Sequence, residues 1–206
     1  SRSESGLPWI ALAGFLAGAA AGCKYTGLVY AAVPLAFWIA VMALRDLPWR
    51  NACGVVAVFC VAGVLGGGGW YIKNAIFTGN PVYPLAYQMF DGATWNAEKA
   101  QRWNRVHNPP SFRPTDFARD VARIGISSEW QSAAVIPFAI LGIIAAWRKK
   151  PDVLRQTFGY LAFIFFVWWV FTHRIDRFWL PALHFLCIFA SFGIGWSSSW
   201  IWRAFA

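Results

Sequence analysis

The sequence predicts an all-α, polytopic transmembrane helix bundle of about six spans, with one long outer loop that contains short helices. Three observations predict this fold class. The 206 residues are 58% hydrophobic and only 13% charged, whereas a typical soluble domain is about a quarter charged. Apolar runs of roughly 15–22 residues recur, which is long enough for helices that cross a bilayer. Many of the 14 Trp and 18 Phe residues lie near the ends of these runs, as in the aromatic belts at membrane surfaces.

The first three apolar runs lie in the N-terminal part of the chain. They occupy residues 7–22, 28–44 and 52–71. In the first run Gly14, Gly18 and Gly22 recur at every fourth position, and this spacing predicts a close-packing face for another helix. The third run contains Gly66–Gly69. Four glycines weaken a helix, so they indicate a kink, a broken turn, or a close approach of another backbone or a lipid chain.

A long polar segment, residues 74–131, separates these runs from three more. The later runs occupy residues 132–147, 157–171 and 178–194, with a continuation to Trp202 left open. We expect residues 1–206 to form a single membrane domain. Because the chain starts at Ser1 without Met, we also expect it to be a piece of a longer protein.

Two short helices are predicted within the polar segment. Trp95–Val106 has the pattern of an amphipathic helix on a membrane surface, ended by Asn108–Pro110. A second helix is predicted with Thr115 as its N-cap and Asp116 in its first turn. Its apolar stripe comprises Phe117, Val121 and Ile124. Two interpretations are open for both helices: a cover over the bundle, or a lid and acceptor platform above a cavity.

The charges of the short loops predict the orientation. Arg45–Arg50 and Arg148–Pro151 are basic, which is typical of cytoplasmic loops. Arg2 and Arg203 fall on the same side if every run crosses the membrane once. Lys24, the long polar segment and residues 172–177 then face outward. The net charge of +9 is explained by this topology and by anionic lipid, so nucleic acid is not expected as a partner.

Two clusters of candidate ligand-binding residues follow the first and third runs. They comprise Lys24, Tyr25, Trp70, Lys73, Asn74, Asn80 and Tyr83. The lysines are interpreted either as anchors whose ammonium groups reach the membrane surface or as contacts for a lipid phosphate. The asparagines either cap a rigid turn or offer amide groups to sugar hydroxyls.

A third candidate cluster lies between the last two runs and contains His173, Arg174 and Arg177. A guanidinium group can donate two hydrogen bonds to one phosphate, which favours a binding role for the arginines. The alternative is structural, with Asp176 paired to Arg174 or Arg177. His173 is interpreted as a hydrogen-bonding residue. All three clusters are predicted to converge on the outer face.

The sequence identifies no catalytic residue. No informative pair of carboxylates, nucleotide-binding loop or hydrolase motif occurs. The four cysteines lie in or beside apolar runs without a metal-ligand spacing. No metal ion and no cofactor are therefore expected.

The order of motifs resembles the polyprenyl-phosphate-dependent glycosyltransferases of the GT-C fold, which include protein O-mannosyltransferases and the bacterial aminoarabinose transferase. The resemblance covers roughly residues 7–196 and rests on Lys24–Leu28, Trp70–Asn74, Thr78–Pro84 and Asp176–Leu183. It implies an integral, multi-pass enzyme of the bacterial inner membrane. Such an enzyme moves a sugar from a polyprenyl-phosphate carrier to an acceptor on the outer face.

The resemblance also implies how the roles are divided. The phosphate is held by Lys24, Lys73, Arg174 and Arg177, and the prenyl chain lies along Gly66–Gly69 or the Trp168–Trp169 region. The family's catalytic acid belongs to a first outer loop that no part of this sequence matches, so the base is expected outside residues 1–206. The expected partners are a polyprenyl-phosphate-linked sugar, membrane lipid and an acceptor of unknown identity. The alternatives are a flippase or transporter of lipid-linked glycans and a structural membrane subunit.

Overall fold

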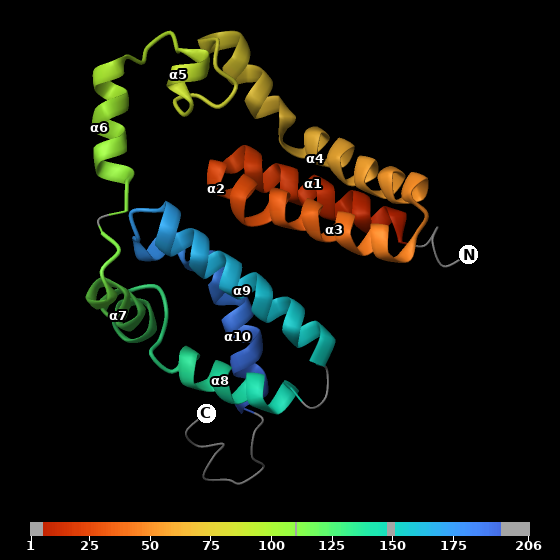
Figure 1. Cartoon of the computed structure of the whole chain (residues 1–206), viewed down its shortest axis with the longest axis vertical. Helices are drawn as coiled ribbons and strands as arrows, with labels where there is room; N and C mark the ends of the chain where they lie inside the picture. The colour runs from red at the N-terminus through yellow and green to blue at the C-terminus, as the bar shows by residue number, and fades with distance from the viewer. Residues whose placement is uncertain (1–5, 110, 148–150, 195–206) are drawn as a thin grey trace. The chain divides into compact units, whose positions relative to one another are not determined.

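The computed structural model of the protein describes residues 6–109, 111–147 and 151–194, and every regular element within those ranges is a helix (Figure 1). The all-α prediction is therefore confirmed. The chain divides after Arg102 into two compact units, which are described separately below.

The first unit is built around three long helical segments. Its elements are α1 (Leu7–Cys23), α2 (Tyr25–Gly27), the π-helical η1 (Leu28–Ala32), α3 (Val33–Asp46), α4 (Trp49–Thr78) and α5 (Tyr87–Phe90). Helix α4 packs against both α1 and α3. It starts directly after Pro48 and ends at Gly79, whose φ of 73° is the left-handed conformation that glycine adopts readily at a helix C-terminus.

The second unit follows helix α6 (Ala97–His107), which spans the division. Its elements are α7 (Pro114–Ala122), the π-helical η2 (Arg123–Ser127), α8 (Val135–Trp147), α9 (Pro151–Phe171), the 3₁₀-helical η3 (Asp176–Phe178) and α10 (Leu180–Ile194). Helix α8 packs most extensively on α10, and α9 contacts both.

A helix lies at each of the six predicted apolar runs, but their lengths differ. Three segments are long and apolar enough to cross a membrane, namely Tyr25–Asp46, Trp49–Thr78 and Leu154–Phe171. The apolar helices Leu7–Cys23, Val135–Ala145 and Leu180–Ile194 are shorter. Six spans therefore stay a prediction. Arg2, residues 148–150, Trp202 and Arg203, which entered the orientation argument, lie outside the described residues.

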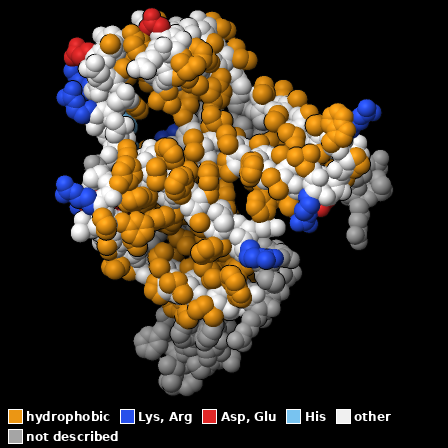
Figure 2. Space-filling model, in the orientation of Figure 1, with side chains coloured by type: hydrophobic (Ala, Val, Ile, Leu, Met, Phe, Trp, Pro, Cys, Tyr) orange, Lys and Arg blue, Asp and Glu red, His pale blue; other side chains and the backbone are white. Residues whose placement is uncertain are grey.

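Large hydrophobic side chains are exposed on the long helices. Phe37 on α3 and Leu65 on α4 are 70% and 75% exposed. Figure 2 shows hydrophobic side chains over much of the visible surface, with Lys and Arg at a few separate places. Such a surface is unusual for a water-soluble protein and fits helices that contact lipid.

The predicted glycine stripe of α1 packs on α4. A Cβ atom added to Gly14 would lie 2.3 Å from the Phe59 carbonyl oxygen, and one added to Gly18 would lie 1.9 Å from that of Gly63. Helix α4 continues unbroken through Gly66–Gly69. Of the proposed roles for these glycines, close approach of another backbone is confirmed at Gly67, where an added Cβ would lie 2.0 Å from the Gly18 oxygen.

A second glycine contact joins α8 and α10. An added Cβ at Gly142 would lie 1.7 Å from the Phe189 oxygen, and one at Gly193 would lie 1.9 Å from the Phe138 oxygen. Each of these glycines stands alone in its apolar run, so no repeated spacing in the sequence predicts this contact. Both units therefore bring helices together at positions without side chains, as helix pairs in membranes often do.

The predicted helices of the polar segment are present with shifted starts. Helix α7 begins at Pro114, so the prediction of Thr115 as N-cap is wrong. Proline suits the first turn because its fixed φ fits a helix. The N–H groups of the first turn have no acceptor within the helix, so proline loses no hydrogen bond there. Asp116 lies in the first turn as predicted. The ring of Phe117, the first residue of the predicted apolar stripe, packs edge-on against Phe165 and Trp169 of α9.

Candidate functional site

The predicted binding residues divide between the two units. Lys24, Tyr25, Trp70, Lys73, Asn74, Asn80 and Tyr83 belong to the first unit, and His173, Arg174 and Arg177 belong to the second. The convergence of all three clusters on one face stays a prediction. Within each unit, the contacts show which residues the fold brings together.

Tyr25 is the centre of the cluster in the first unit. Its hydroxyl donates a hydrogen bond to the Tyr83 carbonyl oxygen and accepts one from Asn74 Nδ2 at 3.2 Å. Its ring lies 6.2 Å from that of Tyr71, whose hydroxyl donates to the Ala21 carbonyl at 2.9 Å. Tyr25 thus ties the end of α1 to α4 and to the turn beyond α4. Lys24, the preceding residue, is exposed.

Asn80 is fully buried and holds that turn together. Its Nδ2 donates to the carbonyl oxygens of Leu85 at 2.8 Å and Asp91 at 3.0 Å, and its Oδ1 accepts from Val82 N at 2.9 Å. These three bonds match the turn-capping interpretation. The hydroxyl of Tyr83 lies 2.6 Å from Thr94 Oγ1, so this side chain also braces the segment beyond α4.

Trp70 and Lys73 form an exposed pair near the end of α4. The Lys73 ammonium lies 4.5 Å from the centre of the Trp70 ring, within the range of a cation–π contact. At the start of the same helix, the Arg50 guanidinium lies 5.6 Å from the Trp49 ring. At about 1.5 Å per residue, the two tryptophans are about 32 Å apart along α4, close to the roughly 30 Å hydrocarbon thickness of a bilayer. Trp70 and Lys73 therefore occupy a position suited to one membrane surface.

Arg174 lies inside the second unit. It is 1% exposed, and its Nη1 donates to Asp120 Oδ2 at 3.1 Å while its Nε donates to the Trp169 carbonyl at 2.8 Å. The guanidinium also stacks over the rings of Trp169 and Phe112, at 4.5 Å and 5.1 Å. All of these contacts are with other residues of the second unit. Asp120 is not among the partners that the sequence predicts for Arg174.

Asp176 pairs with neither of the arginines considered in the sequence analysis. Its Oδ1 lies 3.2 Å from Arg123 Nε, at the start of η2. Arg123 also donates from Nη2 to the Arg174 carbonyl oxygen, and that Nη2 lies 3.6 Å from Asp120 Oδ1. Arg123 therefore joins its own pair with Asp176 to the pair of Arg174 and Asp120. The structural alternative, in which Asp176 pairs with Arg174 or Arg177, is wrong, because Asp176 pairs with the more distant Arg123.

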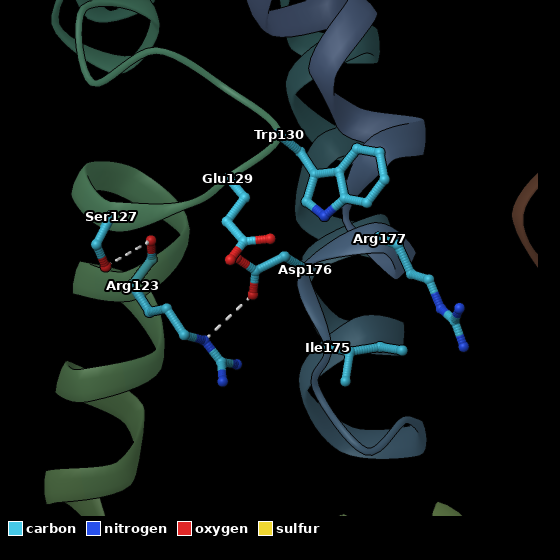
Figure 3. Close-up of a pocket in the computed structure, with 7 residues that line it drawn as sticks. All are labelled: Arg123, Ser127, Glu129, Trp130, Ile175, Asp176 and Arg177. Carbon is cyan, nitrogen blue, oxygen red and sulfur yellow. Dashed lines mark hydrogen bonds and ion pairs between the residues drawn. The ribbon is translucent and has the colours of Figure 1, made fainter.

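An open pocket of about 480 Å³ lies beside this network. Its lining residues are Arg123, Ser127, Glu129, Trp130, Ile175, Asp176 and Arg177. Figure 3 shows the carboxylates of Glu129 and Asp176 pointing toward each other, with the indole of Trp130 and the side chain of Arg177 on the far side. Of these residues, only Arg177 is among the binding residues predicted from the sequence. Glu129, Trp130 and Arg123 stand in no recognisable local motif.

His173 is half-buried among aromatic rings. Its ring lies edge-on to His107 at 4.9 Å and to Phe178 at 5.1 Å. His107 in turn stacks on Trp103 at 3.6 Å, and its Nδ1 lies 2.9 Å from the Trp103 carbonyl oxygen. These contacts place His173 in a packing cluster that joins the end of α6 to the segment after α9.

The described residues offer two kinds of chemistry. One is an exposed ammonium group next to an aromatic ring, at a depth suited to a membrane surface. The other is a pocket lined by two carboxylates, two arginines and an indole. Within residues 6–109, 111–147 and 151–194, no three His, Cys, Asp or Glu side chains are grouped to hold a metal ion. No protein family model, no curated protein and no solved structure matches the chain.

Proposed function

We propose that this protein is a multi-pass membrane glycosyltransferase that moves a sugar from a polyprenyl-phosphate carrier to an acceptor on the non-cytoplasmic face. The observation that supports the proposal best is the position of Lys73. Its ammonium is exposed beside the Trp70 ring, and Tyr25 and Asn74, one residue away from Lys24 and Lys73, are hydrogen-bonded to each other.

The chemistry of this cluster matches a prenyl phosphate. Such a lipid presents an anionic group at the membrane surface and an apolar chain below it. A lysine at the surface attracts the anion, and Trp70 offers an amphipathic ring at the same depth. Val61, Val64 and Leu65, which are 60%, 65% and 75% exposed on α4, provide apolar surface between the two tryptophans, below this depth.

A lysine beside a tryptophan is also a common membrane anchor, so the test needs an anchor as its control. Arg50 and Trp49 provide it, because they form a similar exposed pair at the other end of α4. A role limited to anchoring predicts that Lys73→Ala and Arg50→Ala behave alike. A role in carrier binding predicts that only Lys73→Ala weakens the binding of polyprenyl phosphate.

The experiment uses the full chain in phospholipid nanodiscs with polyprenyl monophosphate and its hexose and pentose conjugates. We expect Lys73→Ala to weaken binding by about 10- to 100-fold, the loss of one hydrogen bond to a charged group, while Arg50→Ala binds as wild type. Equal binding by both variants would reject the site. Transfer is measured as release of polyprenyl phosphate in membranes that contain the full-length protein and its natural acceptors, because the catalytic base is expected outside residues 1–206. No release from any conjugate there would reject the enzymatic activity.

A further inference from the structure

We propose that the pocket beside Arg123 and Asp176 binds a sugar ring, with Trp130 against one face of the ring and Glu129 and Asp176 accepting hydrogen bonds from neighbouring hydroxyl groups. This inference stands on the chemistry of the pocket alone. It holds whether or not the protein transfers the sugar, and Trp130, Glu129 and Asp176 are separate from Lys73, on which the proposed carrier site depends.

The charges of the pocket favour a ligand that donates hydrogen bonds. Ionised carboxylates only accept them, and Figure 3 shows both carboxylates turned toward the same space. Arg123 is already committed to Asp176, Asp120 and the Arg174 carbonyl. Glu129 forms no ion pair within the part of the chain that the structure describes. The Arg177 side chain extends away from the two carboxylates (Figure 3). An anion placed between the carboxylates would face two negative groups, so a phosphate is disfavoured there.

The position of Asp176 is fixed before any ligand arrives. Its side chain is 16% exposed and pairs with Arg123, which lies next to the buried pair of Asp120 and Arg174. The pair of Asp120 and Arg174 is buried, and Arg123 links Asp176 to it, so the network restricts the position of the Asp176 carboxylate. Binding groups that are fixed in advance lose less conformational freedom when a ligand binds.

Trp130 supplies the apolar side of the pocket. It is 53% exposed, and its indole lines the space above the carboxylates (Figure 3). A sugar ring has an apolar face of C–H groups and a rim of hydroxyls, so it suits an aromatic ring beside acceptor groups. The pocket volume of about 480 Å³ lies within the range of small-molecule sites, roughly 300–1,000 Å³.

The test measures ligand binding by saturation-transfer NMR with the full chain in nanodiscs of phospholipids that carry no sugar. The probes are methyl α-mannopyranoside, methyl α-glucopyranoside and the 2-amino derivative of the glucoside. We expect at least one neutral glycoside to bind, and Trp130→Ala and Glu129→Gln each to weaken it about 10-fold, since each removes about 1.4 kcal/mol of contact. Trp49→Ala and Glu98→Gln, which change exposed residues of the other unit, are expected to bind as wild type.

The other outcomes overturn the inference. If only the amino derivative binds, the pocket recognises an ammonium ion and the sugar-ring assignment is wrong. If no probe binds, or if Trp130→Ala binds as well as wild type, the pocket is not a sugar site. Binding of polyprenyl phosphate, measured on the same samples, reports separately on Lys73, so the two proposals can fail independently.

Discussion

The Nη1 atom of Arg174 donates to Oδ2 of Asp120 at 3.1 Å, and the two residues are 1% and 3% exposed. This ion pair joins α7 to the segment that follows α9. A buried charge of either sign is unfavourable without its partner. The pair therefore makes the position of α7 depend on one residue from the cluster that the sequence analysis assigned to phosphate binding.

Replacing Arg174 by Ala is expected to destabilise the second unit by up to about 3–5 kcal/mol, because the buried Asp120 then keeps only its longer contacts to Arg123 at 3.6 Å and Arg119 at 3.8 Å. Arg102→Ala is the control. The Arg102 side chain is 75% exposed and pairs at 3.2 Å with Glu98, whose side chain is 79% exposed, so its loss is expected to cost under about 1 kcal/mol. Denaturant unfolding in detergent measures both. A stable Arg174→Ala protein that has lost phosphate binding would restore Arg174 as a ligand.

Two glycines of the first unit are expected to respond to alanine with opposite signs. Gly18→Ala places a Cβ 1.9 Å from the Gly63 carbonyl oxygen and is expected to destabilise the α1–α4 contact by about 1–3 kcal/mol. Nothing lies within 4 Å of an added Cβ at Gly69, so Gly69→Ala is expected to stabilise α4 by up to about 1 kcal/mol. Thermal unfolding of the two variants provides the measurement. Equal shifts would show that α1 and α4 do not approach as described.

Asn80→Ala is expected to loosen the turn beyond α4 without unfolding the helices. It removes hydrogen bonds to Leu85, Asp91 and Val82, each worth about 1 kcal/mol. Hydrogen exchange of the amides of residues 82–91 should accelerate at least about 10-fold. Asn96→Ala, which removes a single bond from an exposed side chain, is the control. Unchanged exchange in Asn80→Ala would mean that the turn does not depend on this side chain.

The start of α7 is expected to weaken in acid. The hydrogen bond from the Ser111 hydroxyl, with Arg119 nearby, holds the pKa of Asp116 below its usual value of 3.8. Because the pKa of Asp116 is lower in the folded protein than in the unfolded chain, its ionised carboxylate stabilises the fold at pH values above the unfolded pKa of about 3.9. This stabilisation is lost as the pH falls from there through the lowered pKa of the folded protein. Unfolding curves between neutral pH and pH 2 should therefore show a steeper loss in wild type than in Asp116→Asn. Parallel curves would contradict the assignment.

The positions of the helices could be predicted from the sequence because the hydropathy and length of an apolar run depend only on neighbouring residues. The stripe of Gly14 and Gly18 was also visible, since a fixed spacing puts small residues on one helix face. Asp120 and Arg174 are 54 positions apart, and no local pattern links them. Arg174 and Arg177 have similar neighbours in the sequence, yet one is buried and the other lines a pocket. Tertiary packing causes this difference in exposure, and the local sequence predicts the same role for both arginines.

The length of α4 has a further consequence for the cluster at its end. The helix runs on from Trp70 to Thr78, so these last turns raise Asn74 and the Asn80 turn by roughly 6 to 15 Å beyond the tryptophan, at about 1.5 Å per residue. Each residue also turns the helix by about 100°. One residue inserted after Gly69 would lift the cluster only slightly but rotate Asn74 away from Tyr25. The contact between these two side chains thus requires that the number of residues in α4 be fixed.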